Sequence, residues 1–133
     1  MKVSEVMTKR VVSVQMDDRL TVVKEILDNV SFHHLLVVEN ETLQGVISER
    51  DLLRCLSPFL GSDAESARDA TTIAQRAHQV MTRSPITVNS EITVRDALTL
   101  MLAHNIGCLP VLDNGCIVGI FTLRDGLIAL LDN

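Results

Sequence analysis

The sequence predicts a mixed α/β (α+β) fold in which two β-α-β-β-α repeats pack together. Three observations lead to this prediction. The chain repeats itself at an offset of 74 residues, apolar residues within each copy switch between strand and helix spacing, and the apolar residues are almost all aliphatic. Aromatic residues make up only 2% of the 133 residues. A hydrophobic content of 47% with a charged content of 22% indicates a folded globular chain.

One polar cluster occurs twice, each time directly after two apolar stretches. Residues 45–53 read GVISERDLL, and residues 119–127 read GIFTLRDGL. The same offset aligns the VMT of residues 6–8 with the VMT of residues 80–82 without a gap. A repeat in register is a stronger indication of architecture than any single motif.

The repeat sets the predicted domain organisation. We assign residues 1–59 to the first repeat, 60–76 to a linker and 77–133 to the second repeat. Neither copy alone is long enough to bury much core, so we expect the two to pack together.

Both copies predict the same order of elements: a short strand, a helix with apolar residues three or four positions apart, two strands and a last helix. In the first copy the strands are expected at 11–14, 34–38 and 43–47, with the helix between Leu20 and Val30. In the second copy the strands are expected at 86–88, 108–112 and 116–121, with the helix between Val94 and Leu102. The last helix of each copy is expected to begin at the hydroxyl residue of the polar cluster.

Local signals place the ends of these elements. Asp17-Asp18 and Ser90-Glu91 supply acceptors and negative charge where the N–H groups of a helix start are free. Asp113-Asn114-Gly115 predicts a hairpin with a type I′ turn. Residues 64–77 are polar and rich in Ala, which predicts an exposed or edge helix in the linker.

Composition excludes several classes of function. A net charge of −5 and the absence of Trp and Tyr argue against a nucleic-acid partner, which needs basic patches and stacking side chains. No stretch reaches the roughly 18 apolar residues of a membrane span, and the first residues do not form a signal peptide. Cys55, Cys108 and Cys116 lack metal-binding spacing, so we expect free thiols in a reducing, cytoplasmic setting.

The polar cluster places a hydroxyl, an Arg and an Asp where a strand ends and a helix begins. A hydroxyl there caps the helix or binds a phosphate oxygen, helped by the free N–H groups of the helix start. An Asp three residues later lies one turn further on the same face, and its carboxylate accepts both hydroxyls of a ribose. The Arg meets phosphate with its planar guanidinium group.

Each of these residues also has a purely structural interpretation. Ser-x-x-Asp and Thr-x-x-Asp are ordinary helix-capping patterns, and Arg50 and Arg124 are equally expected in surface salt bridges. His33 and His34 are adjacent, so on a strand they face opposite sides, which does not favour a shared metal. We expect a satisfied polar edge there, and no metal site. Met7 and Met81 are expected in the core.

The duplicated pattern, with VMT, a strand, a helix, an LPVV-like strand and the Gly-x-x-Ser/Thr-x-x-Asp cluster, resembles the CBS domain, named after cystathionine β-synthase. A tandem pair resembles a Bateman module. The resemblance implies two repeats related by a pseudo-two-fold axis. It also implies adenosyl ligands, namely AMP, ADP, ATP, S-adenosylmethionine or a dinucleotide, and regulation of an enzyme, transporter or channel, often by dimers shaped as flat discs.

The resemblance also implies which residues bind the ligand. The ribose-binding Asp of the family falls on Asp51 and Asp125, its hydroxyl residue on Ser48 and Thr122, and its base-contacting segments on residues 10–13, 84–87, His33-His34 and Gly107-Cys108. One cleft would join Ser48, Arg50 and Asp51 with Ile86 and Cys108, and the other would join Thr122, Arg124 and Asp125 with Val12 and His34. The first copy departs from the family pattern at Leu36, where the second copy has the expected proline, Pro110.

Three classes of function follow. The first is a non-catalytic, energy-sensing module that binds an adenine nucleotide, requires no other cofactor, forms a homodimer and acts in trans on an unknown effector protein. The second is a ligand-free structural or dimerisation module. The third is an enzyme, which we do not expect because the chain has no Ser-His-Asp order, no Walker-type glycine loop and no metal-ligand cluster.

Overall fold

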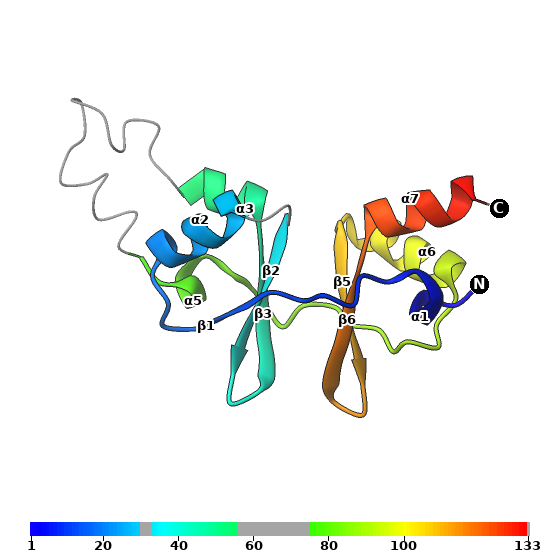
Figure 1. Ribbon diagram of the computed structural model, residues 1–133, viewed down its shortest axis with the longest axis horizontal. Coiled ribbons are helices and arrows are strands. Elements are labelled where there is room, and N and C mark those ends of the chain that lie inside the picture. Colours follow the sequence, from blue (N-terminus) through cyan, green and yellow to red (C-terminus); the bar gives the residue numbers. More distant parts are fainter. Residues whose placement is uncertain (30–32, 56–74, 133) are drawn as a thin grey trace. The chain divides into compact units, whose positions relative to one another are not determined.

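The computed structural model describes residues 1–29, 33–55 and 75–132, which form two compact units (Figure 1). Unit 1 consists of Met1–Val11 and Pro85–Asn133, and unit 2 consists of Val12–Ser84. The units therefore do not coincide with the repeats of the sequence. The first eleven residues of the chain fold with the second copy, and the start of the second copy folds with the first.

Unit 2 is built on a four-stranded sheet with the order β1-β2-β3-β4. β1 (Ser13–Gln15) runs parallel to β2 (His34–Glu39), whereas β3 (Thr42–Ser48) is antiparallel to both β2 and β4 (Thr82–Arg83). The helices of this unit are α2 (Leu20–Asn29), α3 (Glu49–Cys55) and the short α5 (Ala77–Val80).

Unit 1 repeats this plan around a hairpin of β5 (Cys108–Asp113) and β6 (Cys116–Thr122). Where unit 2 has its outer strands, unit 1 has two isolated β-bridges, one between Val88 and Val111 and one between Thr8 and Ile120. The helices are α1 (Val3–Val6), α6 (Val94–His104) and α7 (Leu123–Leu131), and α1 contacts α7 (Figure 1). Both hairpins carry a register shift at equivalent positions, Val37/Val38 and Val111/Leu112, so the duplication extends to irregularities of the backbone.

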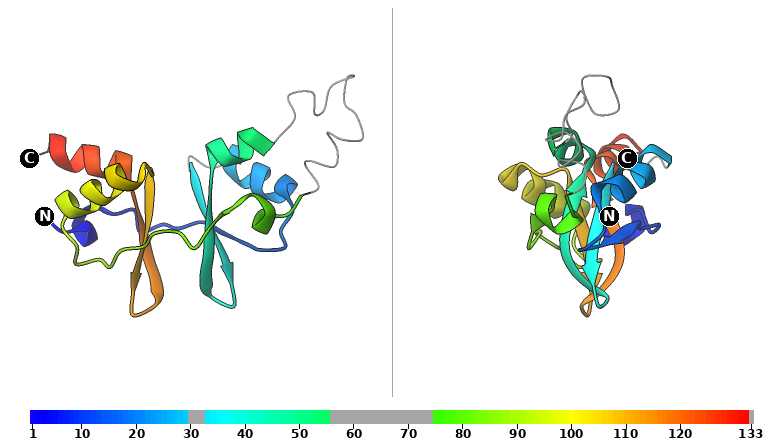
Figure 2. Two further views of the ribbon diagram at one scale, coloured as in Figure 1. Left: turned by 180° about the vertical axis from the view of Figure 1, so that it is seen from behind. Right: turned by 90° about the vertical axis from the view of Figure 1, so that its left-hand side faces the viewer.

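Each unit has its own hydrophobic core between its hairpin and its helices. Figure 2 shows the hairpin and the helices of each unit from two further sides. In unit 1 the core includes Val3 from the start of the chain, Met101 from α6 and Phe121 from β6. In unit 2 it includes Leu20, Ile47 and Met81. Met81 is buried and Met7 packs against the unit 1 core, as the sequence predicted.

The predicted type I′ turn is confirmed. Asn114 and Gly115 have φ of 53° and 79°, so both central residues are left-handed, as this turn requires. The first hairpin uses the same conformation at Asn40 and Glu41, with φ of 51° and 64°. Glu41 therefore adopts a conformation that favours glycine, which the sequence pattern alone did not reveal.

Other expectations were wrong in detail. The segment 86–88 forms a single bridge at Val88 instead of a strand. Ser90 and Glu91 do not cap α6, because that helix begins three residues later, with Thr93 Oγ1 accepting from the N–H of Asp96 at 3.0 Å. Ser90 instead donates to Asp113 at the end of β5, through its N–H at 2.9 Å and its hydroxyl at 2.6 Å. The expected linker helix lies almost entirely outside the described residues.

Two glycines allow the exchanged segments to lie close to the hairpins. A Cβ placed on Gly119 would lie 2.9 Å from both the carbonyl oxygen of Thr8 and the sulfur of Met7. A Cβ placed on Gly45 would lie 2.7 Å from the carbonyl oxygen of Thr82 and 2.6 Å from the sulfur of Met81. Because a backbone atom cannot move aside as a flexible side chain can, these positions require glycine.

We expect Gly119→Ala to destabilise the protein by about 1–3 kcal/mol, because the added methyl group overpacks a backbone contact. Urea unfolding followed by circular dichroism measures this. Gly115→Ala is the control, since its Cβ meets nothing within 4 Å and only its left-handed backbone is affected. Amide exchange at Thr8, whose N–H donates to Ile120 at 2.9 Å, should accelerate in Gly119→Ala only. Equal exchange in the two variants would contradict the role given to Gly119.

Candidate functional site

Ser48 and Asp51 form a closed pair at the junction of β3 and α3. The N–H of Asp51 donates to Ser48 Oγ at 3.0 Å, and the N–H of Ser48 donates to Asp51 Oδ2 at 3.0 Å. This reciprocal arrangement is a capping box, which satisfies an N–H group that the helix itself leaves free. No described residue donates a hydrogen bond to Asp51 Oδ1, so this half-buried carboxylate keeps acceptor capacity.

Thr122 and Asp125 form the equivalent pair at the junction of β6 and α7. The N–H of Asp125 donates to Thr122 Oγ1 at 3.2 Å, and the N–H of Thr122 donates to Asp125 Oδ2 at 3.0 Å. The structural interpretation of both pairs as helix caps is therefore confirmed. Capping does not exclude ligand binding, because a carboxylate has about four lone-pair sites and the cap uses one of them.

Thr8 is a residue of this site that the sequence analysis missed. Its hydroxyl lies 3.1 Å from Oδ1 and 3.2 Å from Oδ2 of Asp125, to which it donates. The only signal for it in the sequence is the repetition of VMT at residues 6–8 and 80–82. A contact between residues 117 positions apart leaves no local pattern.

The two predicted histidines lie next to the cluster of unit 2. His34 is the register partner of Ser48 across β2 and β3. Burial lowers the pKa of His34, the neighbouring His33 lowers it further, and the charge of Asp51 acts in the opposite direction. His33 is exposed, and its Nδ1 lies 2.7 Å from Glu49 Oε2, which agrees with a satisfied polar edge.

Cys108 occupies the corresponding place in unit 1, as the register partner of Thr122 across β5 and β6. Burial, together with the negative charge of Asp125, raises the pKa of the Cys108 thiol to about 12. Cys55, Cys108 and Cys116 are all free cysteines. The raised pKa favours the neutral form of this thiol.

Val12 and Ile86 belong to different units. The carbonyl of Val12 accepts from the N–H of Leu36 at 3.1 Å, and its side chain packs against the core of unit 2. Ile86 packs against the core of unit 1. Val12 therefore lies in the same unit as Asp51, and Ile86 lies in the same unit as Asp125. That one ligand contacts residues of both units stays a prediction.

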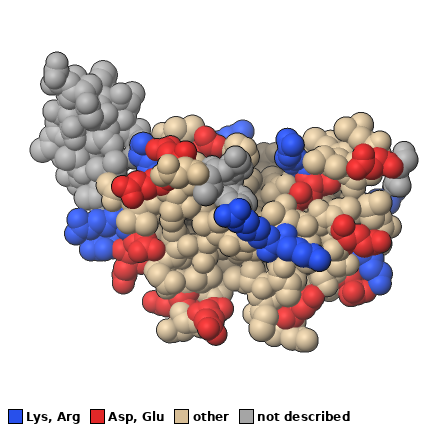
Figure 3. Space-filling model, in the orientation of Figure 1, with Lys and Arg blue, Asp and Glu red and all other residues tan. Residues whose placement is uncertain are grey.

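Arg50 and Arg124 are exposed, and neither forms an ion pair with any described residue. The salt bridges expected under the structural interpretation are therefore not seen among the residues described. Acidic side chains lie on both units on the face drawn in Figure 3, in keeping with the net charge of −5. The two arginines each stand one residue before an Asp of the candidate site.

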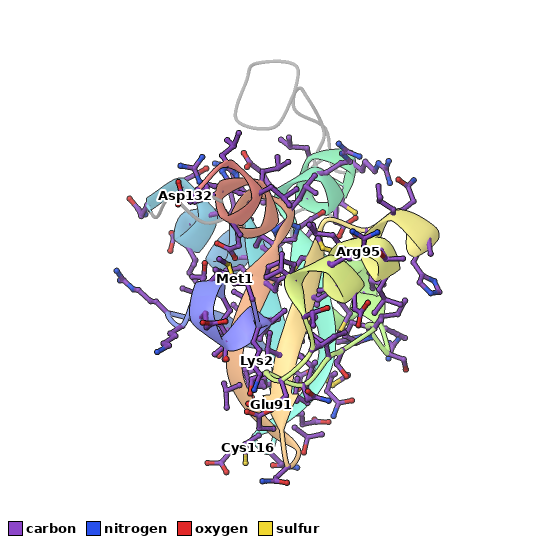
Figure 4. All side chains as sticks on the ribbon, turned by 90° about the vertical axis from the view of Figure 1, so that its right-hand side faces the viewer. Met1, Lys2, Glu91, Arg95, Cys116 and Asp132 are labelled. Atoms are coloured by element: carbon purple, nitrogen blue, oxygen red, sulfur yellow. The ribbon has the colours of Figure 1, made fainter. Side chains whose placement is uncertain are left out.

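Two pockets in the described part of unit 1 differ in whether a predicted site residue lines them. A pocket of about 590 Å³, lined in part by Thr87, Glu91 and Leu100, contains none of the predicted site residues. Glu91 points toward Lys2, with 2.5 Å between the charged atoms (Figure 4). A second pocket of about 280 Å³ is lined by Asp125 together with Glu5 and Asp132, and its three carboxylates would repel a phosphate group.

Among residues 1–29, 33–55 and 75–132, no group of three or more His, Cys, Asp or Glu side chains could hold a metal ion. Over the same residues, no helix has the length and apolar character needed to cross a membrane.

Comparison with known sequences supports the duplicated architecture. The sequence profile of the CBS domain family matches residues 3–58 and 77–132. A CBS domain-containing protein of Dictyostelium discoideum is 34% identical over 132 residues, which cover 97% of this chain and 90% of that protein. The internal repeat predicted from the sequence is confirmed by the two family matches.

Comparison with solved structures supports the fold. A crystal structure of CBSX2 in complex with AMP is 29% identical in sequence, with a TM-score of 0.80, and the match covers 98% of this chain and 96% of that one. A signal-transduction protein with CBS domains from Burkholderia ambifaria MC40-6 is 20% identical, with a TM-score of 0.83 over 100% of this chain and 96% of that one. At that identity, the second likeness concerns the fold alone.

We expect Cys108 to resist alkylation in the folded protein, because a thiol with a pKa of about 12 is thiolate in about one molecule in ten thousand at pH 8. Iodoacetamide treatment at pH 8, followed by digestion and mass spectrometry, measures labelling at each cysteine. Cys116, which is exposed, is the internal control and should react first. Labelling of Cys108 should require urea. Equal rates at the two cysteines before unfolding would contradict this assignment.

Proposed function

The chain belongs to the CBS domain family, and we propose that it is a regulatory module that binds an adenosine-containing ligand. The ligand class is AMP, ADP, ATP or S-adenosylmethionine. The proposed role is non-catalytic and requires no further cofactor. A change in ligand occupancy would shift the population of states that an effector protein recognises in trans. We propose a cytoplasmic location, because the three cysteines are free thiols.

One observation carries this proposal: both copies hold a half-buried carboxylate in a fixed orientation at the same strand–helix junction. The capping bonds fix Asp51 and Asp125 through one oxygen each, at 3.0 Å in both cases. A carboxylate fixed in advance loses little rotamer entropy when it accepts the two hydroxyls of a ribose. The complex of CBSX2 with AMP supports adenosine as the ligand class.

Arg50 and Arg124 supply positive charge that complements the phosphate of a nucleotide. Arg50 and Arg124 precede the two aspartates and are exposed, so their guanidinium groups are accessible to a phosphate. The aliphatic residues of the strands, such as Val12 and Ile86, would contact the faces of the adenine. His33, His34 and Cys108 are proposed to line the edge of the base.

A ligand-free structural module is the second candidate. It is favoured by one observation, the completeness of the capping boxes at Ser48 and Thr122, which explains the repeated spacing within the chain without any ligand. The two candidates differ in whether an adenosyl compound stabilises the folded state.

We expect AMP, ADP, ATP or S-adenosylmethionine to raise the melting temperature of the purified chain. A ligand that binds only the folded state adds about 2.7 kcal/mol of stability at a hundredfold excess over its dissociation constant. Thermal melting followed by circular dichroism, with GTP as the comparison nucleotide, measures this. Asp51→Ala combined with Asp125→Ala should abolish the shift.

The matched control is Asp17→Ala combined with Asp96→Ala, which removes the same charge from exposed positions outside the candidate site. This control should keep the full ligand-induced shift. If none of the adenosyl compounds moves the melting temperature of the unmodified chain, the ligand-free module becomes the better account.

We also propose that the chain forms a homodimer through its last helices. Leu53 on α3 and Leu127 on α7 occupy equivalent positions of the two copies and are 64% and 50% exposed. Leu131 on α7 is 84% exposed. Large apolar side chains repeated at equivalent exposed positions are typical of interaction surfaces, and a second copy presents the same surface in return.

We expect Leu53→Glu combined with Leu127→Glu to convert a dimer into a monomer of 14.7 kDa, because the new carboxylates would face one another without solvent. Light scattering after size exclusion measures the mass. Leu102→Glu, at an 81% exposed position of α6, is the control and should leave the dimer intact. A monomeric unmodified chain, or a double variant that stays dimeric, would rule out this interface.

A further inference from the structure

The candidate site differs between the two units in one contact. In unit 1 the hydroxyl of Thr8 donates to both oxygens of Asp125, at 3.1 and 3.2 Å. In unit 2 the equivalent residue is Thr82, 74 positions along, and it donates no hydrogen bond to Asp51. The two carboxylates are therefore held differently, although their capping boxes are the same.

The backbone fixes Thr8 in place. Its N–H donates to the carbonyl of Ile120 at 2.9 Å, and the N–H of Ile120 donates to the carbonyl of Thr8 at 2.9 Å. Gly119, next to Ile120, lets the carbonyl of Thr8 approach closely. Because both main-chain groups of Thr8 are bonded to β6, and Asp125 lies one turn beyond the end of β6, the hydroxyl reaches the carboxylate without moving the backbone.

The contact leaves Asp125 able to bind a ligand. Its carboxylate has about four lone-pair sites, and the Thr122 N–H and the shared Thr8 hydroxyl use about two of them. About two sites remain, which is the number that a ribose diol requires. Asp51, with its single donor from Ser48, has more free acceptor sites but no contact that fixes Oδ1.

We propose that Thr8 is a positioning residue for Asp125, so that the two carboxylates differ in affinity and Asp125 is the one that engages an adenosyl ligand first. This inference rests on the proposed function. A side chain that is fixed before binding loses less entropy on binding. Removal of the Thr8 hydroxyl should therefore weaken the binding at Asp125 by about three- to tenfold.

The experiment measures AMP binding to the full chain by calorimetry. Asp51→Ala leaves Asp125 as the only ribose-accepting carboxylate, and in this background Thr8→Val should weaken binding by about three- to tenfold. Thr8→Ser, which keeps the hydroxyl, should restore the affinity. The matched control is Thr82→Val in the Asp125→Ala background, where the affinity should change by less than about twofold because Thr82 does not contact Asp51.

Two outcomes would overturn the inference. One is an unchanged affinity in Thr8→Val, and the other is an equal loss in the Thr82→Val control. Circular dichroism identifies any variant that fails to fold. The Thr8→Ser variant should bind AMP as tightly as the unmodified chain does.

A measurement without ligand separates this inference from the proposed function. Three-bond couplings from NMR report whether the χ1 angle of an Asp occupies one rotamer. We expect Asp125 to populate its main χ1 rotamer more fully in the unmodified chain than in Thr8→Val, where only the capping bonds remain, with Asp51 unaffected. If the unmodified chain binds no adenosyl compound, the proposed function fails, while unchanged couplings of Asp125 in Thr8→Val would show that Thr8 does not position it.

Discussion

The close contact between each exchanged segment and a glycine of the opposite copy is the constraint on which the rest of the structure depends. The carbonyl oxygens of Thr8 and Thr82 lie only 2.9 and 2.7 Å from where a Cβ on Gly119 and Gly45 would stand. In unit 2 this contact accompanies the pairing of β4 with β3, and in unit 1 it accompanies the bridge between Thr8 and Ile120. It also places the strand–helix junction, and with it the candidate site, beside a segment from the other copy.

The two hydroxyl–Asp pairs cap a helix and also hold a carboxylate that can accept hydrogen bonds from a ligand. Each pair ends a strand and starts a helix through two reciprocal hydrogen bonds. The same bonds orient a half-buried carboxylate, which would otherwise sample several rotamers. Fold and proposed binding therefore use the same atoms, and a substitution at Asp51 or Asp125 affects helix capping as well as any ligand. This is why the controls for the site are matched in charge.

Much of the fold was predictable because the duplication repeats local signals. The hairpin at Asn114-Gly115, the positions of the central helices and the helix start after Thr122 all follow from short-range patterns, and the structure agrees with them. The capping pairs were also visible as a spacing of three. The partner of Asp125 was not, because Thr8 approaches from 117 residues away. The exchange of segments was equally hidden, since a repeat in the sequence does not specify with which copy its first residues fold.

The exchange has a consequence for the order in which the chain folds. Unit 2 is continuous in sequence, from Val12 to Ser84, so all of its residues are synthesised before the second part of unit 1, Pro85–Asn133. Unit 1 is discontinuous, and Met1–Val11 fold only with residues that follow Ser84 in the sequence. Contacts at such large sequence separation form slowly. The apolar segment with Val3 and Met7 therefore stays exposed until residues from Pro85 onward have been synthesised.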